Sequence, residues 1–560
     1  MREAARRRGA PRLGRRPPVA SAGVTSGERA PAAAGDPAVP GPARPRTPHP
    51  VRLGDLLAAL RPRIDVELVG GGPDAAATEL TGATSASGLA RPGDLFAAFP
   101  GARAHGAAHA AQALERGAAA VLTDAAGAAR IGPAVPVLRT EAPRVAAGLA
   151  ADEVYGRPSA ELAIAGITGT SGKTTTTYLI RAGLAGLGAP VGVIGTVGAF
   201  AGQAPIASTM TTPEAADLHA LLAVMRERGS ALVAMEVSSH ALELDRVSGV
   251  RFAVAAFTNL SRDHLDFHPD MEAYFEAKAR LFDGRAARAV ICLDDWWGRR
   301  LADRVPGAAT VSTLADTGAM WTAGEPSVGA DGSTRFRVRG PAGTFAAGCR
   351  IPGAYNVANV LVALAVIDAL GADAEAAAPH VAQAQVPGRM ERVEAGQGFK
   401  AIVDYSHKPA ALEGALRALR PLTAGRLILV VGCGGDRDRE KRPLMGEVAA
   451  RAADVVIVTD DNPRSEPPEA IRAAMLAGAR GVPAAERAQL RETDRRRLAI
   501  HQALALAQDG DTVLIAGKGH ETGQEVAGVV HPFDDRQVVR EGLAALGFAT
   551  EAPEPAEAGR

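Results

Sequence analysis

Short apolar runs alternate with segments of helical periodicity along most of the chain. In residues 51–157 this pattern predicts helices at Leu53–Leu60 and Ala107–Arg116 and strands at Gly93–Phe99 and Ala118–Thr123. Because strands and helices alternate in this segment, we expect it to fold as a small α/β domain.

A second unit begins with an apolar strand at Glu161–Gly166, which leads into a Gly/Thr/Ser turn and a helix that starts at Lys173. Further strands are predicted at Val191–Ile194, Ala231–Val237 and Phe252–Thr258, with helical patterns between them. Strands that are separated by helices run parallel, so residues 158–387 are expected to form a mainly parallel sheet.

A third unit starts near Gly388. Its predicted strands are Ala401–Asp404, Leu427–Val431, Val455–Thr459 and Thr512–Ala516, and its predicted helices lie near 410–420, 443–452, 467–479 and 493–508. This alternation predicts a second doubly wound sheet over residues 388–548. The expected fold class is therefore α/β with three domains.

The two ends of the chain have no hydrophobic period. Residues 1–50 hold ten Arg and three acidic residues among many Pro, Gly and Ala, which predicts a disordered basic tail. This tail lacks the apolar region of a secretory signal. Residues 549–560 are rich in Pro, Ala and Glu, and disorder is expected there as well.

Composition argues against several classes of protein. The 62 basic residues balance 62 acidic residues, which is unlike a general nucleic-acid binder. No apolar run approaches the ~18 residues of a membrane-spanning helix. The single cysteines at 292, 349 and 433 lack the spacing of a metal site or a disulfide framework, so we expect a reducing compartment, by default the cytoplasm.

Lysine is rare in this Arg-rich chain. The six lysines stand at 173, 278, 400, 408, 441 and 518. Each is a candidate for a role that Arg cannot fill, as a compact point charge or as an amine that can lose its proton. The residues around Lys278 alone predict a surface lysine that pairs with Glu276 or with a neighbouring turn.

The segment Gly166–Thr175 places a glycine-rich turn between a strand and a helix. Backbone N–H groups of such a turn can hold phosphates, with Lys173 at the β- and γ-phosphates and Thr174 at a Mg²⁺ ion. The strict phosphate-loop spacing requires Gly at 167, where this chain has Ile. The segment therefore predicts a variant loop that binds ATP or GTP.

Polar side chains follow two further strands. Glu236 lies at the end of the strand in Met235–His240, where ligands of open α/β sheets bind and where a carboxylate can hold Mg²⁺. The next strand ends in Thr258–His268, and its Asp263 and His264 suggest a metal and phosphate site. A zinc hydrolase is the alternative, but no His-Glu-x-x-His pattern supports it.

Seven segments together resemble the Mur ligase family. They are Gly169–Thr174, Met235–His240, Thr258–Asp266, Gly388–Glu391, Val403–His407, Gly432–Asp438 and Gly517–Glu521. The resemblance implies an N-terminal UDP-substrate domain at 51–157, a central P-loop ATPase domain at 158–387 and a Rossmann-like C-terminal domain at 388–548. It also implies a ligase in which ATP phosphorylates a carboxylate and an amine then displaces the phosphate.

The resemblance implies roles for residues that match the family's motifs. Lys173, Glu236, His264 and Lys278 are the expected catalytic residues. One Mg²⁺ is expected at Thr174 and Glu236, and a second at His264 and a carbamylated Lys278, since only an amine can be carbamylated. The expected ATP contacts are Gly169, Thr170, Ser171, Gly172, Lys173, Thr174, Thr175, Asn356, Asn359, Arg389, Asp404 and His407.

The amino-acid pocket distinguishes members of the family. Asp461–Arg464 matches the pattern of members that add meso-2,6-diaminopimelate, whose far end carries an ammonium and an extra carboxylate. We expect Arg464 to hold that carboxylate in a bidentate fork and Asn462 with Glu521 to hold the ammonium. The bare ammonium of lysine would face a buried Arg, which is unfavourable. The expected pocket comprises Arg437, Asp461, Asn462, Pro463, Arg464, Gly517 and Glu521.

The acceptor substrate that the resemblance implies is UDP-N-acetylmuramoyl-L-alanyl-D-glutamate. Its expected contacts are Ser87 at the uridine end and Thr211, Thr212, Ser238 and Arg246 at the muramoyl peptide. The chain departs from the family at three places. It has Ala86–Gly88 where relatives often have Asp-Ser-Arg, Leu244 where some have Gln, and Lys408 where some have Thr.

Other functions remain open. A lysine-adding Mur ligase is the first alternative. A folylpolyglutamate synthetase-like ligase is the second; it shares the mechanism of the central ATPase domain, but the N-terminal domain and the Asp461–Arg464 pattern speak against it. A non-catalytic scaffold is the third alternative, but such a protein would not need to keep Lys173, Glu236, His264 and Lys278. We expect a cytoplasmic monomer that makes a peptidoglycan precursor.

Overall fold

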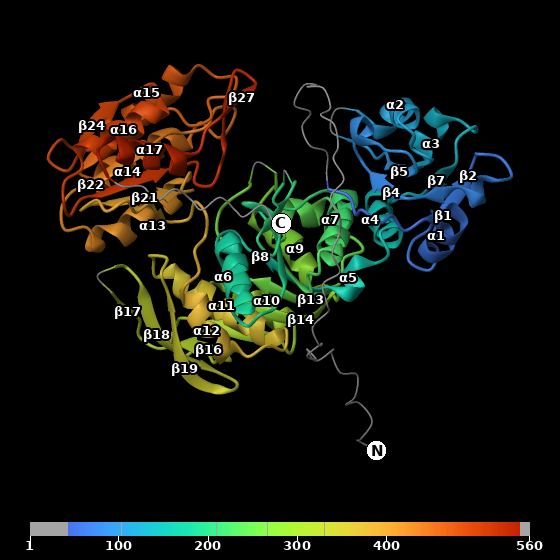
Figure 1. Ribbon diagram of the computed structural model, residues 1–560, viewed down its shortest axis with the longest axis horizontal. Coiled ribbons are helices and arrows are strands. Elements are labelled where there is room, and N and C mark those ends of the chain that lie inside the picture. Colours follow the sequence, from blue (N-terminus) through green and yellow to red (C-terminus); the bar gives the residue numbers. More distant parts are fainter. Residues whose placement is uncertain (1–42, 102–103, 209, 266, 330, 549–560) are drawn as a thin grey trace, which may run out of the picture.

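The computed structural model describes residues 43–101, 104–208, 210–265, 267–329 and 331–548. Three larger sheets lie within these ranges, each with helices packed against it, so the predicted α/β fold class is confirmed (Figure 1). We call the parts that carry them the N-terminal unit (43–157), the central unit (158–387) and the C-terminal unit (388–548). None of the described helices is both long enough and apolar enough to cross a membrane.

Residues 1–42 of the tail predicted at 1–50, the tail predicted at 549–560, and Asp266 of the family motif lie outside the described residues. The end of the predicted N-terminal tail, however, is placed. Arg44 forms an ion pair with Asp94 at 3.1 Å, and the backbone N–H of Thr47 donates to Glu227 at 2.8 Å. The described structure therefore begins before the expected boundary at Val51.

The N-terminal unit is built on a mainly parallel sheet with the strand order β2-β7-β6-β5-β4. These strands are Glu67–Val69, Val137–Arg139, Ala120–Thr123, Asp94–Ala97 and Gly82–Thr84. Helix α1 (Leu53–Leu60) covers the predicted residues and buries Leu53, Leu56 and Leu60. The predicted helix at 107–116 is instead a 3-10 turn followed by the shorter helix α2 (Ala110–Glu115).

The central sheet has a parallel core in the order β9-β12-β8-β13-β14-β15-β16. These strands are Val191–Gly195, Leu232–Glu236, Ala163–Thr168, Phe252–Phe257, Ala286–Cys292, Ala309–Ser312 and Trp321–Ala323. The strand predicted at Glu161–Gly166 is displaced by two residues because Pro158–Glu161 forms the short helix α5. Antiparallel strands β10 (Gly198–Ala201), β17 (Ser327–Val328), β18 (Thr334–Gly340) and β19 (Gly343–Cys349) extend its edges and were not predicted.

Helices pack on both faces of the central sheet. Helix α6 (Lys173–Gly186) lies against α11 (Tyr355–Ala369) and α12 (Ala374–Ala382), and the three share one hydrophobic core with the sheet (Figure 1). Helix α7 (Ala215–Glu227) joins two cores. Its alanines pack in the N-terminal core beside α4 (Pro143–Val154), while its leucines and Met225 pack under the central sheet.

The C-terminal sheet has the order β20-β21-β25-β22-β23-β24. Its strands are Glu391–Arg392, Lys400–Asp404, Thr512–Ala516, Leu427–Val431, Val455–Val458 and Gln489–Glu492, and its helices are α13 (Pro409–Leu419), α14 (Lys441–Ala452), α15 (Pro468–Arg480), α16 (Arg496–Leu506) and α17 (Asp535–Ala545). The four predicted strands agree within one residue and the four predicted helices within three. A separate hairpin, β26 (Gly523–Val526) and β27 (Val529–Pro532), was not predicted.

Candidate functional site

The phosphate loop connects β8 to α6, as predicted. Gly169 has φ 148° and Gly172 has φ 85°. A Cβ atom at Gly169 would collide with the hydroxyl of Thr258, and one at Gly172 would collide with the amide oxygen of Asn359. Both glycines are therefore required by a left-handed backbone and by close neighbours.

Lys173 folds back over this loop. Its Nζ donates to the carbonyl oxygens of Gly169 at 2.8 Å and Thr170 at 3.0 Å. Burial lowers the pKa of Lys173, and Glu236 acts against this shift. Thr174, the next residue, is buried on the first turn of α6. The loop thus gathers a lysine and a hydroxyl at the N-terminus of a helix, which is where phosphates bind.

Glu236 stands at the end of β12, next to the phosphate loop in the sheet, because β12 pairs with β8. Its carboxylate is 1% exposed. One carboxylate oxygen accepts the N–H of Thr196 at 2.8 Å, and the other accepts the Thr196 hydroxyl at 3.0 Å. Thr196 was not predicted; its place directly after the apolar strand β9 was the available signal.

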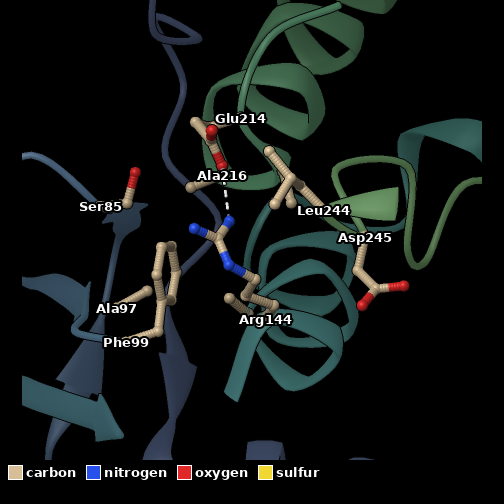
Figure 2. A pocket seen from close by; sticks show the side chains of 10 residues that line it. Ser85, Ala97, Phe99, Arg144, Glu214, Ala216, Leu244 and Asp245 are labelled. Atoms are coloured by element: carbon tan, nitrogen blue, oxygen red, sulfur yellow. Dashed lines mark ion pairs between the residues drawn. The ribbon is translucent and has the colours of Figure 1, made fainter. Parts of the chain in front are cut away.

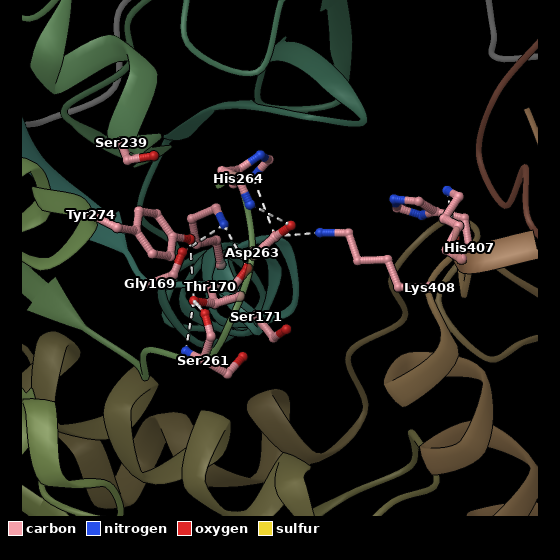
Figure 3. A network of polar contacts seen from close by, with 12 residues as sticks. Gly169, Thr170, Ser171, Ser239, Ser261, Asp263, His264, Tyr274, His407 and Lys408 are labelled. Carbon is pink, nitrogen blue, oxygen red and sulfur yellow. Dashed lines mark hydrogen bonds and ion pairs between the residues drawn. The ribbon is translucent and has the colours of Figure 1, made fainter. Parts of the chain in front are cut away.

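The loop after β13 lies on the other side of the phosphate loop (Figure 3). Asn259 accepts the N–H of Ser171 at 2.9 Å and donates to the carbonyl of Ser171 at 3.1 Å. His264 has φ 53°, and its Nε2 lies 3.3 Å from Asp263. Burial lowers the pKa of His264 to about 4, so the ring is a neutral imidazole near pH 7, the form that can ligate a metal.

Lys278 is not the surface lysine that its local sequence predicted. It is 1% exposed on α9 (Met271–Ala279), and its Nζ donates to Gly169 O at 2.9 Å, the carbonyl that Lys173 also contacts. Burial, with Lys173 as a second cause, lowers the pKa of Lys278 well below the usual value. The long-range contact to the phosphate loop could not be read from the neighbouring residues.

Three other predicted ATP contacts come from the C-terminal unit. Arg389 lies 3.5 Å from the Thr174 hydroxyl and 4.4 Å from the Tyr405 ring centroid. Asp404 accepts the N–H of Met390 at 2.8 Å and is buried. His407 contacts the carbonyl of Tyr405 at 2.8 Å, and burial lowers its pKa to about 4.

The two predicted asparagines lie on α11 of the central unit. Asn359 donates to Asn356 at 2.9 Å, and Asn356 donates to the carbonyls of Ile351 and Pro352 at 3.2 and 3.0 Å. These bonds fix both amides, and the amide of Asn359 lies next to Gly172. The phosphate loop is thereby contacted from both the central and the C-terminal unit.

Lys408 was noted as a departure from the family, and the structure gives it a partner. Its Nζ forms an ion pair with Asp263 of the central unit. Figure 3 shows Lys408 reaching from the C-terminal unit toward Asp263 and His264. Although burial raises the pKa of Asp263, Lys408 and His264 lower it overall. Asp263 is therefore ionised and links the two units.

The predicted amino-acid pocket follows the ends of the neighbouring strands β22, β23 and β25. Asn462 donates to Glu521 at 2.9 Å, and its amide oxygen accepts from Lys518 Nζ and from the N–H of Glu525, each at 3.0 Å. Both lone pairs of that oxygen are thus used. Asn462 therefore has a donor rather than an acceptor left for a substrate, and its expected role with an ammonium stays a prediction.

Lys518 was missed as a pocket residue although it is one of the six lysines. It is fully buried, and its Nζ also contacts Glu521 at 2.9 Å. The ammonium therefore fixes Asn462 and Glu521 together and offsets the charge of Glu521.

Arg464 adopts φ 53° and is already paired. Its Nη1 donates to Gly435 O at 2.7 Å, and its Nε lies 3.2 Å from Glu525. Its side chain is 23% exposed. The Arg was expected to be buried, whereas its side chain is partly exposed and paired, so rejection of lysine cannot rest on the burial of that charge alone.

The remaining residues of the predicted amino-acid pocket are Arg437, Asp461, Pro463 and Gly517. Arg437 is exposed, and its Cγ would lie 3.9 Å from a Cβ built on Gly434. A Cβ on Gly517 would lie 2.6 Å from an oxygen of Asp461, and the carbonyl of Pro463 leaves no room for a side chain at Gly435. These glycines therefore lie close to the backbone or side chains of the other predicted pocket residues.

The predicted muramoyl-peptide contacts lie beside Glu236. Thr212 donates to Glu236 O at 2.9 Å and accepts the N–H of Ser238 at 3.2 Å, and Thr211 lies 3.2 Å from the Thr196 hydroxyl. Arg246 donates to the carbonyl of Thr212 at 3.3 Å. These four residues form one hydrogen-bonded group with the candidate metal ligand.

Ser87 belongs to a different unit and donates to Gln112 at 2.7 Å. A pocket is lined by residues of both the N-terminal and the central unit, among others by Ser85, Phe99, Arg144 and Glu214 (Figure 2). Arg144 lies 3.5 Å from Glu214 and 4.2 Å from the Phe99 ring centroid. Arg144 was not predicted, and nothing in its local sequence signals the site.

Comparison with known proteins accounts for all three units. Residues 81–154 match the family model described as "Mur ligase family, catalytic domain", 167–367 match "Mur ligase middle domain", and 388–519 match "Mur ligase, glutamate ligase domain".

Two curated relatives and one solved structure are similar over most of the chain. The relatives from Streptomyces coelicolor and Streptomyces avermitilis, both named UDP-N-acetylmuramoyl-L-alanyl-D-glutamate--2,6-diaminopimelate ligase, are 52% and 50% identical over 89% and 90% of this chain and 98% of their own lengths. A solved structure of a protein with this name has a TM-score of 0.60 and 33% identity, covering 84% of this chain and 96% of the other. The chain therefore belongs to the Mur ligase family.

Proposed function

We propose that this chain is an ATP-dependent ligase that adds meso-2,6-diaminopimelate to the D-glutamate carboxylate of UDP-N-acetylmuramoyl-L-alanyl-D-glutamate, a step of peptidoglycan precursor synthesis. The single observation that carries the proposal is the arrangement of the strand ends. The phosphate loop, Glu236 and the His264 loop follow adjacent strands β8, β12 and β13, as ligand sites of parallel sheets do. The names of the similar proteins give the substrates.

The residues present fit an ATP-bound Mg²⁺. Thr174 and Glu236 supply a hydroxyl and a carboxylate, the hard oxygen donors that this ion prefers. In the described residues no group of three or more His, Cys, Asp or Glu could hold a metal, so phosphate oxygens would complete the coordination. His264 and a carbamylated Lys278 would hold a second ion. Bound Mg²⁺ would supply charge neutralisation at the transferring phosphoryl group.

The protein side chains would then act on a poor electrophile. A carboxylate resists attack by an amine because oxide is a poor leaving group, whereas an acyl phosphate releases phosphate readily. Lys173, which lies within Coulombic reach of Glu236, would neutralise negative charge that builds up on the phosphoryl oxygens. The pocket of Arg464, Asn462 and Glu521 would hold the far end of the incoming amino acid.

Contacts between the central and C-terminal units support a reaction in which the acyl phosphate is protected before the amine attacks it. The pairs Lys408–Asp263 and Arg389–Thr174 join the C-terminal unit to the phosphate loop. Closure of these units would exclude water from the acyl phosphate and protect it from hydrolysis. The buried free cysteines agree with a reducing compartment, and we expect the enzyme to act as a cytoplasmic monomer.

Purified protein with ATP, Mg²⁺ and the UDP-muramoyl dipeptide tests the proposal. Phosphate should be released when diaminopimelate is added, and the UDP-muramoyl tripeptide should appear at the same rate. Replacing diaminopimelate by lysine addresses the main alternative. Phosphate release that is equal with and without any amino acid would reject a ligase, and preferential use of lysine would assign the runner-up.

A further inference from the structure

The hairpin β26–β27 is fixed against the strand end that carries Arg464. The N–H of Arg464 donates to Glu525 O at 3.1 Å, and the N–H of Ala527 donates to Arg464 O at 2.7 Å. The N–H of Glu525 also donates to Asn462 at 3.0 Å. Glu525 is therefore placed by backbone bonds rather than by a chance surface encounter.

The charges of this region form two separate pairs. Lys518 contacts Glu521 at 2.9 Å and is fully buried, while Arg464 contacts Glu525 at 3.2 Å with side chains 23% and 38% exposed. The charge of Glu521 is thus offset from inside the protein by a group that no substrate can displace. Glu525, in contrast, faces solvent and shares an accessible cation.

We propose that Glu525 is a specificity-determining residue that recognises the distal ammonium of the amino-acid substrate, while Arg464 takes the adjacent carboxylate. The inference rests on the proposed function, since it assigns the zwitterionic end of diaminopimelate to this pair. An ion pair of opposite charges can exchange partners with a zwitterion, forming two contacts where one existed. A substrate end with a carboxylate alone must displace Glu525 and leaves it unpaired beside another anion.

The experiment compares diaminopimelate with 2-aminopimelate, which lacks only the distal amine. In the Glu525→Gln variant, kcat/KM for diaminopimelate should fall about tenfold, corresponding to about 1.4 kcal/mol, whereas kcat/KM for 2-aminopimelate should be unchanged or rise. The preference for diaminopimelate then falls at least tenfold, and KM for ATP stays constant.

Matched variants separate recognition from folding. Val530 faces Glu525 on β27 and is 66% exposed, so Val530→Thr should leave both substrates unaffected. Glu525→Asp, which keeps the charge on a shorter arm, should retain part of the preference. Equal loss of activity on both substrates, or an unchanged preference, would overturn the role of Glu525. Wild-type protein that does not use diaminopimelate at all would instead reject the proposed function.

Discussion

At the residue scale, the half-buried Lys173 and the fully buried Lys278 share one carbonyl acceptor. Lys173 and Lys278 both donate to Gly169 O, at 2.8 and 2.9 Å. Burial, and next the positive charge of Lys173, lower the pKa of Lys278 well below its usual value. A neutral amine is the form that reacts with carbon dioxide to give a carbamate.

Lys278→Arg should therefore abolish turnover, with a loss of at least about 100-fold, because a guanidinium cannot become a carbamate. A short carboxylic acid should partly restore activity to Lys278→Ala by supplying the missing carboxylate. Steady-state rates with and without added acid measure this. Lys400→Arg is the control, since Lys400 contacts Leu422 O away from the phosphate loop and should stay active. A fully active Lys278→Arg variant would dismiss carbamylation.

Arg464 allows a second prediction at this scale. Arg464→Ala should raise KM for diaminopimelate about 10- to 100-fold, the effect of losing one charged hydrogen-bonding partner. KM for ATP should not change, because Arg464 lies at the end of β23 rather than at the phosphate loop. Initial rates over both substrates test this. An equal rise of both KM values would point to misfolding of the C-terminal unit.

The phosphate loop, Glu236 and His264 could be identified because each follows an apolar strand, whereas the roles of the helical residues Asn356, Asn359 and Lys278 came from the family resemblance. Sequence missed the side chains that hold the site residues in place. Thr196 fixes Glu236, which lies 40 residues away in the sequence. Lys518 fixes Glu521 and also Asn462, which lies 56 residues away. The burial of Lys278 depends on a contact 109 residues away. Such distant pairing has no periodic signal in a single sequence.

At the element scale, regular α/β segments were predictable and sheet edges were not. Strands β22 and β25 match their predicted ranges because buried parallel strands are continuous apolar runs. Strand β18 (Thr334–Gly340) alternates buried and exposed residues. Its exposed positions are arginines and its buried positions include Thr334, so the hydrophobic alternation in the sequence is weaker than in an apolar strand. The two-residue strands β17 and β20 are too short for any period to identify.

Helix α7 illustrates an element whose role depends on two neighbours at once. Its Ala216, Ala220 and Ala223 pack in the N-terminal core, and Leu218 and Met225 pack under the central sheet. Packing on two opposite sides leaves little room for water at its first turn. Asp217 lies there, and burial raises its pKa to about 6, although Arg44 acts against the shift.

Asp217→Asn should stabilise the protein at neutral pH. The Asp217 carboxyl has a pKa of about 6 in the folded protein. At pH values between its unfolded pKa and 6 it therefore binds more protons in the folded protein than in the unfolded chain, and stability falls as pH rises through this window. Removing the charge should therefore gain about 1 kcal/mol at pH 7.5 and less at pH 5. Thermal unfolding at both pH values measures this. Asp55→Asn, at an exposed position of α1, is the control, and an equal gain at both pH values would contradict the assignment.

At the scale of the whole molecule, the N-terminal and central units share core packing around α7, and one hydrophobic cluster that includes Val386, Met390 and Leu412 runs from the central unit into the C-terminal unit. Charged side chains additionally join the C-terminal unit to the loops at the phosphate site. The pair Lys408–Asp263 has side chains 39% and 12% exposed, so it is weak and sensitive to salt. Such a contact can form and break during each catalytic cycle.

Lys408→Ala should lower kcat/KM about two- to fivefold at low ionic strength, the effect expected of a partly exposed ion pair. Added salt should lower kcat/KM of the wild type toward that of the variant, because the pair is screened. Rates measured over a salt series test this. Arg420→Ala removes a pair of similar exposure within the C-terminal unit and should leave the salt dependence unchanged. Parallel salt curves for wild type and Lys408→Ala would exclude a role in joining the units.

Transfer of oxygen from the acceptor tests the central claim most directly. The UDP-muramoyl dipeptide is labelled with ¹⁸O in the D-glutamate carboxylate and incubated with ATP, Mg²⁺ and diaminopimelate, and the released phosphate is analysed by mass spectrometry. Activation of that carboxylate by phosphorylation predicts one ¹⁸O atom in each phosphate and a tripeptide formed in equal amount. Unlabelled phosphate released together with tripeptide would contradict the account.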